Sequence, residues 1–252
     1  PGSREAMSWN GNPYVIQFTT NTLALHYNKD LFEEAGLTRP PATWEELREW
    51  AEKLTKPEKG QYGFAYSAYY SEEATWHFLP FLWSNGGDLL DLEAPESIEA
   101  LEFVTSFVRD GYTPRDIVNW NQGDVGVQFR LGNVAMMVQG CWDIPLSEEE
   151  NMNFGVAVLP TPDGSVPTVP IGGEAFGMSP FSSPEKQEAA WRFLEYLMSE
   201  EVMARFNARV NNIPTRISVG PSVIEEKPLL EPFVLELQNG RSRSEAGGVK
   251  DP

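Results

Sequence analysis

Cysteine and histidine are scarce in this sequence of 252 residues. The single cysteine, Cys141, excludes an internal disulfide and a cysteine-built metal cluster. The two histidines, His26 and His77, lie in no motif typical of a metal site or of a base beside a nucleophile. We therefore expect neither a dedicated metal site nor a nucleophilic triad, and we expect both histidines to have packing or surface roles.

Phosphate-binding loops are also missing. The segment Gly123–Gly126 lacks the lysine and the spacing of a P-loop, and no Gly-x-Gly-x-x-Gly follows a strand. The sequence therefore predicts no nucleotide and no other cofactor. A pair of carboxylates for glycoside hydrolysis stays open, because acidic residues are plentiful and their separation depends on the three-dimensional structure.

Basic residues are few compared with acidic residues. Only 19 lysines and arginines stand against 37 acidic residues, which gives a net charge of -18. Such a surface repels phosphate backbones, so we expect no nucleic acid as a partner. No apolar run reaches the ~18 residues of a membrane-spanning helix, and residues 1–4 lack the features of a signal peptide. If the protein is exported, we expect that information to lie upstream of Pro1.

Strand and helix patterns are mixed along the chain, which is typical of an α/β protein. Alternating apolar residues between Thr22 and Asn28 predict a strand with one apolar face. The apolar runs 134–138 and 155–159 predict strands that are buried on both faces. Residues 160–173 hold four prolines and three glycines and predict an ordered crossing between two lobes, with a further strand at 175–178.

Three helices can be located from caps and periodicity. Thr43-Trp44-Glu45-Glu46 is a capping-box pattern, which predicts that a helix begins at Thr43. A second helix ends near Gly111, and a third opens at Ser183 with Pro184. The residues expected to face the core are Ile98, Leu101, Val104 and Val108 in the second helix, and Ala190, Phe193, Leu194 and Leu197 in the third.

Aromatic residues make up 12% of the chain, and several tryptophans stand beside glycine or at strand ends. Trp142 follows a buried strand at a bend that glycine permits, where a flat ring can face a cleft. A sugar has an apolar face and a rim of hydroxyls, so its site needs aromatic rings with amide, carboxylate and backbone partners. The candidate ligand-binding residues of these types are Asn21, Trp76, Trp142, Gly172, Gly173 and Glu174, of which the last three offer exposed backbone N–H groups beside a carboxylate.

The order of these segments is informative. The series begins with NTLALHYNKDLFEEAGL at 21–37 and PATWEEL at 41–47, and it closes with NIPTR at 212–216. Between them come WSNGG at 83–87, the strand and Gly140-Cys141-Trp142, the Gly172-Gly173 pair and the helix around AAWRFL at 189–194. This ordered series covers about residues 8–240 and resembles the family 1 extracellular solute-binding proteins of ABC importers, which are maltose-binding-protein-like.

The resemblance implies a type II periplasmic-binding-protein fold, in which two α/β lobes joined by a multi-strand hinge close over a ligand. Residues 1–28 would end the N-terminal lobe and form the first hinge strand, and residues 29–168 would form the C-terminal lobe. Residues 169–218 would return to the N-terminal lobe, and residues 219–252 would start the final helices of the C-terminal lobe. It also implies that the chain lacks the first part of the N-terminal lobe and that the tail after Gly240 matches nothing in the family.

The implied function is that of an extracytoplasmic substrate-binding subunit, periplasmic or lipid-anchored on the cell surface. It would bind a sugar or oligosaccharide without catalysis, present it to the membrane permease and act as a monomer. Asn21 matches a polar ligand contact, Trp142 a ring that stacks on sugar, and Gly172-Gly173 a turn that lines the cleft, while Trp76 falls near another contact segment. The alternatives are a carbohydrate-active hydrolase and a binder of a non-sugar solute on the same fold, since Glu174 could pair with a cationic ligand.

Overall fold

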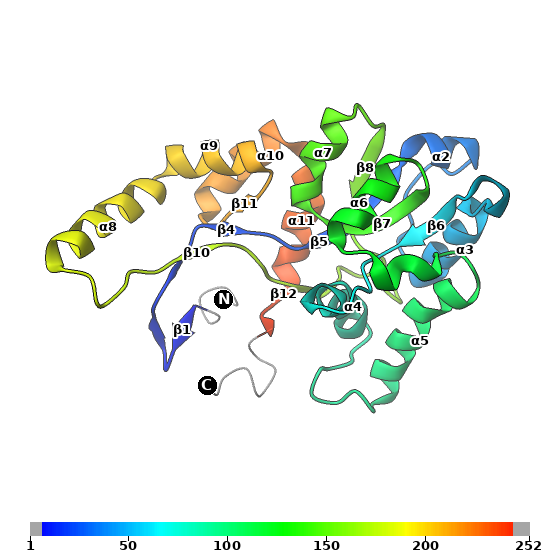
Figure 1. Ribbon diagram of the computed structural model, residues 1–252, viewed down its shortest axis with the longest axis horizontal. Coiled ribbons are helices and arrows are strands. Elements are labelled where there is room, and N and C mark those ends of the chain that lie inside the picture. Colours follow the sequence, from blue (N-terminus) through cyan, green and yellow to red (C-terminus); the bar gives the residue numbers. More distant parts are fainter. Residues whose placement is uncertain (1–6, 244–252) are drawn as a thin grey trace.

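A four-stranded sheet forms the centre of the larger part of the molecule (Figure 1). The computed structural model describes residues 7–243, so the expectations for residues 1–4 and for the tail from 244 onward lie outside it. The strand order is β6-β7-β5-β8, comprising β6 (Tyr62–Ala65), β7 (Val134–Gly140), β5 (Leu23–Asn28) and β8 (Phe154–Ala157). β5 pairs antiparallel with both β7 and β8, whereas β6 runs parallel to β7.

The two middle strands are covered on both faces. All residues of β7 are buried, as predicted for the run 134–138. In β5 every residue except Tyr27 is buried, including the polar side chain of His26. The alternation seen in the sequence therefore marks the strand correctly but does not mark an exposed face, because helices cover the sheet on both sides.

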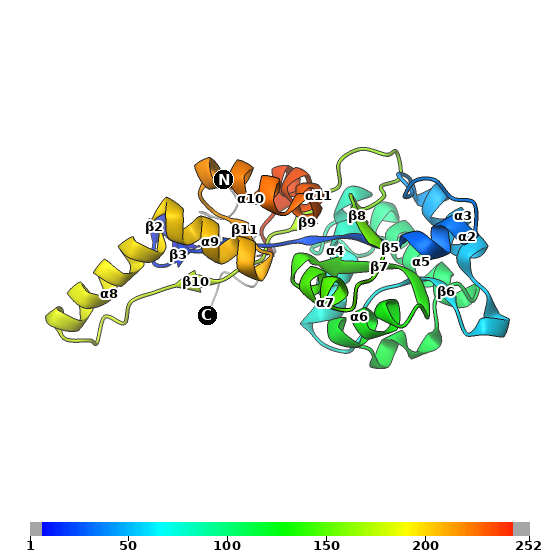
Figure 2. The same cartoon turned by 90° about the horizontal axis from the view of Figure 1, so that it is seen from above.

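Helices gather around this sheet, and we call the sheet and these helices the sheet body (Figure 2). Helix α3 packs on β6 and β7, α6 packs on β7, and α4 packs on α5. The helices of the sheet body are α2 (Lys29–Glu34), α3 (Trp44–Leu54), α4 (Glu72–Ser84), α5 (Pro95–Arg109), α6 (Gln122–Arg130) and α7 (Ile144–Glu149).

The predicted start of α3 is confirmed. The Thr43 side chain accepts a hydrogen bond from the Glu46 backbone N–H at 3.2 Å, which satisfies one of the free donors of the first turn. The Glu46 carboxylate accepts from the Ala42 backbone N–H and pairs with Arg39. These contacts hold the pKa of Glu46 down to about 2, mainly through the hydrogen bond from Arg39.

The buried face of α5 differs from the prediction. Val104 is buried, but Ile98 and Leu101 are 47% and 53% exposed. The residues that pack inward are Ser97, Ala100, Val104, Ser106 and Phe107. The helix is thus rotated from the expected stripe, because small residues let α5 approach α4 closely and Phe107 supplies the core volume.

A second, slimmer group of elements, here called the outer body, extends from the sheet body (Figure 2). Two short antiparallel pairs form its strands, β3 with β10 and β4 with β11. Its elements are β3 (Ile16–Gln17), β4 (Thr19–Thr20), β10 (Ala175–Phe176), β11 (Ile213–Pro214), α8 (Pro184–Leu197), α9 (Glu200–Val210) and α10 (Gly220–Glu226).

Helix α8 begins where predicted but buries less than predicted. Leu194 is its one buried residue, whereas Phe193 is 56% exposed and was wrongly expected to face inward. Trp191 and Tyr196 are also exposed. The helix has a wide apolar surface, and the described chain covers only a narrow stripe of it.

The chain crosses between the two bodies in extended segments. β4 leads directly into β5, and residues 160–173 return as the predicted ordered crossing, which contains β9 (Val169–Pro170). Helix α11 (Glu231–Glu236) packs against β5, and β12 (Gly240–Arg241) then pairs parallel with β9. The remaining strands form a hairpin of β1 (Ser8–Trp9) and β2 (Asn12–Pro13).

Candidate functional site

Asn21, Gly172 and Trp76 meet where β4 passes into β5. Asn21 and Gly172 form a bridge in which the Gly172 N–H donates to the Asn21 carbonyl at 2.9 Å and the Asn21 N–H donates back at 3.3 Å. A β-carbon on Gly172 would lie 2.2 Å from Asn21 Oδ1 and 2.9 Å from Cη2 of Trp76. Glycine is therefore required here, since any side chain would collide with both neighbours.

The Gly172 carbonyl is held by side chains that the sequence did not single out. Gln17 Nε2 donates to it at 2.9 Å, and Thr20 Oγ1 donates at 3.1 Å. Gln17 is buried, and its Oε1 atom has no protein hydrogen-bond partner among the described residues. Both residues lie in short strands with no motif around them, so their role depends on the β3–β10 and β4–β11 pairing.

The turn after Gly172 differs from its expected chemistry. The N–H groups of Gly172 and Glu174 were expected to be free, but they donate to the Asn21 carbonyl and to Thr19 Oγ1. Gly173 has φ +122° and lies so close to the Thr19 carbonyl that a β-carbon would be 2.1 Å from it. The exposed Glu174 carboxylate accepts a hydrogen bond from the Thr19 hydroxyl. The turn is therefore a tightly fixed support that presents one carboxylate.

Trp142 lies in a short 3-10 turn (Cys141–Asp143) that follows β7. A β-carbon at Gly140 would lie 2.2 Å from Cη2 and Cζ3 of Trp142, so the indole ring rests on the glycine backbone. The ring is only partly buried. This packing fixes the plane of the ring. Gly140 itself has extended backbone (φ -87°), so glycine is needed there for space under the ring and not, as expected from the sequence, for the bend.

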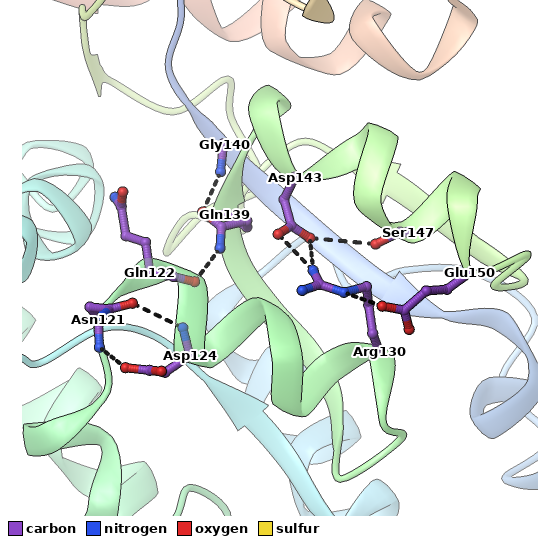
Figure 3. Close-up of polar contacts among 9 residues, drawn as sticks. All are labelled: Asn121, Gln122, Asp124, Arg130, Gln139, Gly140, Asp143, Ser147 and Glu150. Carbon is purple, nitrogen blue, oxygen red and sulfur yellow. Dashed lines mark hydrogen bonds and ion pairs between the residues drawn. The ribbon is translucent and has the colours of Figure 1, made fainter.

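A buried ion pair anchors the turn that carries Trp142 (Figure 3). Arg130 Nη1 lies 2.8 Å and 3.1 Å from the two carboxylate oxygens of Asp143, and both side chains are less than 10% exposed. Ser147 and Glu150 complete the group. Burial raises the pKa of the Asp143 carboxyl, while Arg130 acts against that rise. The turn is thereby tied to α6.

Cys141 is fully buried, as expected for a packing role. Its Sγ atom lies 3.4 Å from Asn212 Oδ1, which joins the Trp142 turn to the outer body. Burial raises the pKa of the thiol to about 12, and the negative charge of Glu174 adds to the rise. The Glu174 carboxylate therefore acts on the same turn that carries Trp142.

Trp76 lies on α4 and is 6% exposed. Its indole nitrogen is buried and has no protein partner among residues 7–243. The guanidinium of Arg243 lies 4.4 Å from the ring centroid, and Arg243 also pairs with Glu72. One side of this ring is thus in contact with the C-terminal segment, and its edge faces Gly172.

The part of the chain that the structure describes contains no group of three or more histidine, cysteine, aspartate or glutamate side chains that could hold a metal ion. Within residues 7–243, none of the helices has the length and apolarity that a bilayer crossing requires.

Comparison with known proteins identifies the architecture. A family model described as bacterial extracellular solute-binding protein matches residues 1–232. The chain belongs to this family. Its members are solute-binding proteins rather than enzymes, and the two α/β bodies are those of a periplasmic binding protein of the maltose-binding type, as the sequence predicted.

Individual relatives agree with this assignment. The maltose-bound structure of T. maritima MalE3 superposes with a TM-score of 0.86 at 29% identity, covering 96% of this chain and 65% of that one. A binding protein of Brucella abortus (strain 2308) is 30% identical over 81% of this chain and 51% of its own length. The maltotriose-binding protein of Pyrococcus abyssi is 27% identical over 95% of this chain and 52% of its own. The chain thus spans about half the length of these curated relatives.

Proposed function

We propose that this chain is part of a carbohydrate-binding subunit of an ABC importer, which binds without catalysis. The observation that carries the proposal is the meeting of Trp76 with Asn21 and Gly172 at the crossing between the two bodies. Trp142 rests on Gly140 at the end of β7 and supplies a second ring. The relatives named for maltose and maltotriose support a sugar as the ligand.

The chemistry of these residues suits a sugar. Indole rings offer flat apolar surfaces for the C–H face of a pyranose, and the Asn21 amide and Glu174 carboxylate offer partners for its hydroxyls. The Trp142 ring and the Gly172-Gly173 turn are already held in place before a ligand binds. Binding therefore loses less conformational entropy than it would with mobile groups. We infer that the ligand lies between the sheet body and the outer body, beside the six predicted site residues, with the partly exposed Trp142 ring and the exposed Glu174 carboxylate as its most accessible contacts.

The boundaries expected from the sequence serve as the proposed lobes. Residues 29–168 would form one lobe, which holds most of the sheet body, and residues 1–28 and 169–218 would form the other lobe with its crossings. β5 (Leu23–Asn28), which the sequence assigned to the hinge, is a central strand of the sheet body and would belong to the first lobe. The described part of the final segment, residues 219–243, would be divided, because α10 packs on α9 and β11 while α11 packs on β5. We place the last lobe boundary between α10 and α11, and closure would be a hinge motion at the crossings.

The partners and location follow from the same proposal. The full protein would act outside the cytoplasm, in the periplasm or lipid-anchored at the cell surface, as a monomer that presents its sugar to a membrane permease. An exposed Glu174 carboxylate also favours a second candidate, a cationic non-sugar solute on the same fold.

A ligand screen tests the proposal. A panel of mono- and oligosaccharides is added to the full-length protein, and the expected result is a rise in Tm for at least one sugar, since a ligand that binds only the native state stabilises it. Trp142→Ala should weaken that binding about tenfold or more, whereas Trp191→Ala on the exposed side of α8 should not. A Tm that no sugar raises, or release of reducing sugar from an oligosaccharide, contradicts the proposal.

A further inference from the structure

A buried histidine is the chain neighbour of one predicted site residue. His77 follows Trp76 on α4 and is 0% exposed. Its two ring nitrogens each have a partner: the Ser67 backbone N–H lies 3.1 Å from Nδ1, and the carboxamide nitrogen of Gln122, Nε2, lies 2.9 Å from the Nε2 atom of His77. The other histidine, His26, has no partner for either nitrogen among the described residues. His77 is thus the histidine with a defined polar environment.

The backbone contact fixes the tautomer of His77. An amide N–H can only donate, so Nδ1 must accept from Ser67 and cannot carry a proton. Burial holds the pKa of His77 down to about 3, so the ring is neutral at physiological pH. A neutral imidazole carries one N–H, and Nε2 must therefore hold the proton.

This tautomer fixes the orientation of the Gln122 carboxamide. Because Nε2 of His77 donates, the Gln122 nitrogen beside it cannot also donate there. The oxygen and nitrogen of the carboxamide must therefore exchange places, so that the oxygen faces the ring and accepts. The amide NH2 of Gln122 then points to the opposite side. That end of the side chain has no partner among the described residues, and Gln122 is partly exposed.

The backbone of Gln122 is held on both sides. Its N–H donates to Glu73 Oε2 at 2.8 Å, and its carbonyl accepts from Gln139 Nε2 at 2.8 Å. The preceding residue, Asn121, forms a capping box with Asp124 that fixes the start of α6. The backbone of Gln122 is therefore fixed in position, and the contact with His77 orients the carboxamide at the other end of its side chain.

The position of Gln122 relates it to both aromatic rings. Its partner His77 is the neighbour of Trp76 in the chain, and its partner Gln139 precedes Gly140, on which the Trp142 ring rests. Figure 3 shows the Gln122 side chain extending away from α6 on the same side as Gly140. The Glu174 carboxylate at the candidate site only accepts hydrogen bonds, so a directed donor complements it.

We propose that His77 is a positioning residue that turns the Gln122 carboxamide so that its NH2 group donates a hydrogen bond to an oxygen of the bound sugar. The proposal rests on the proposed function, because it assigns a specificity-determining donor to that site. It predicts that every sugar that binds has an acceptor oxygen facing the Gln122 NH2 group. It also predicts that replacing this NH2 group by an acceptor weakens binding.

The ring tautomer is tested without any ligand. Long-range ¹⁵N–¹H spectra of the full chain at neutral pH should show His77 with Nε2 protonated and Nδ1 unprotonated. The sequence has only two histidines, so a His26→Phe variant assigns the signals. A proton on Nδ1 overturns the proposed orientation.

The donor role is tested with matched variants and a sugar that the wild-type protein binds. Gln122→Glu keeps an oxygen facing His77 but replaces the outward NH2, so the affinity should fall about tenfold or more, and Gln122→Met should also weaken binding. Gln128→Glu, on the same helix, controls for added negative charge and should bind as wild type. Wild-type affinity of Gln122→Glu overturns the donor role.

A further pair of variants tests the action through His77. His77→Gln retains a donor toward Gln122 and should bind more tightly than His77→Leu, which has none; equal weakening by both, at matched Tm, contradicts positioning. If the wild-type protein binds no sugar in the panel, the proposed function fails. The ring-nitrogen spectra then still decide whether the Gln122 amide is oriented as inferred.

Discussion

The sheet body and the outer body use their apolar residues in opposite ways. In the sheet body every residue of β7 is buried. The ring centroid of Phe64 lies 6.5 Å from that of Phe81 and 4.9 Å from that of Phe107. In the outer body Leu194 is the one buried residue of α8, and Phe193 remains more than half exposed. A helix that is amphipathic in sequence is therefore not necessarily a buried one.

This difference has an energetic consequence. Hydrophobic stabilisation scales with the apolar area removed from water, so the free energy of unfolding should come mainly from the sheet body. The outer body is held by short strand pairs and by contacts at the crossings. Substitutions of the same chemistry should thus have unequal effects in the two bodies.

The largest effect is expected from truncating a core ring. Phe64→Ala should lower the free energy of unfolding by about 3–5 kcal/mol, because it removes a fully buried ring and leaves a cavity. The matched variant Phe193→Ala on α8 should change it by less than about 0.5 kcal/mol. Urea unfolding followed by circular dichroism measures both, and equal losses would show that α8 is as well packed as the sheet.

The next effect concerns the buried ion pair under Trp142. Arg130→Met should destabilise the sheet body by about 3 kcal/mol, because it leaves the Asp143 carboxylate buried without a cation. The double variant Arg130→Met/Asp143→Leu should recover most of the loss. Removing the exposed pair on α8 with Arg192→Met should cost less than about 1 kcal/mol. Urea midpoints compare the three, and a double variant no more stable than the single one would contradict the argument.

The third effect is a dependence on pH that belongs to the sheet body. Burial lowers the pKa of His26 to about 3, so between this value and about 6.5 the unfolded chain binds more protons than the native one. His26 therefore does not reduce the free energy of unfolding above pH ~6.5. Below that pH, down to the native pKa of about 3, the free energy of unfolding falls by about 1.4 kcal/mol per pH unit because of this residue.

His26→Leu removes this dependence and two unpaired polar atoms from the core. The variant should be at least as stable as wild type at neutral pH and should show a shallower loss of stability in acid, with His77 contributing the remaining slope. Urea unfolding at several pH values measures the slope. An unchanged acid slope would show that His26 is protonated in the native protein.

The smallest effect compares two helix starts. Thr43→Ala should destabilise α3 by about 1 kcal/mol, because the hydroxyl caps the first turn. Ser199→Ala at the start of α9 should cost less than about 0.5 kcal/mol, since Ser199 forms no such cap and donates to the Tyr196 carbonyl instead. Thermal unfolding can measure both changes in Tm. A larger fall in Tm for Ser199→Ala than for Thr43→Ala would contradict the prediction.

Local signals in the sequence predicted local features well. The hydroxyl of Thr43 and the apolar run of β7 each act through near neighbours, and each was interpreted correctly. The burial of Ile98 and Phe193 was predicted wrongly, because periodicity identifies an apolar side of a helix but does not say what covers it. The order of the segments predicted the family.

The sequence by itself thus determined the α/β elements, the family and the residue types of the proposed site. Only the tertiary structure decided how they combine: that Gly172 has no room for a side chain beside Asn21 and Trp76, that its N–H is already used, and that His77 faces Gln122. The reason is that hydrogen bonds and steric contacts between residues far apart in the chain depend on strand pairing at the crossings. A sequence read along one dimension does not contain those distances.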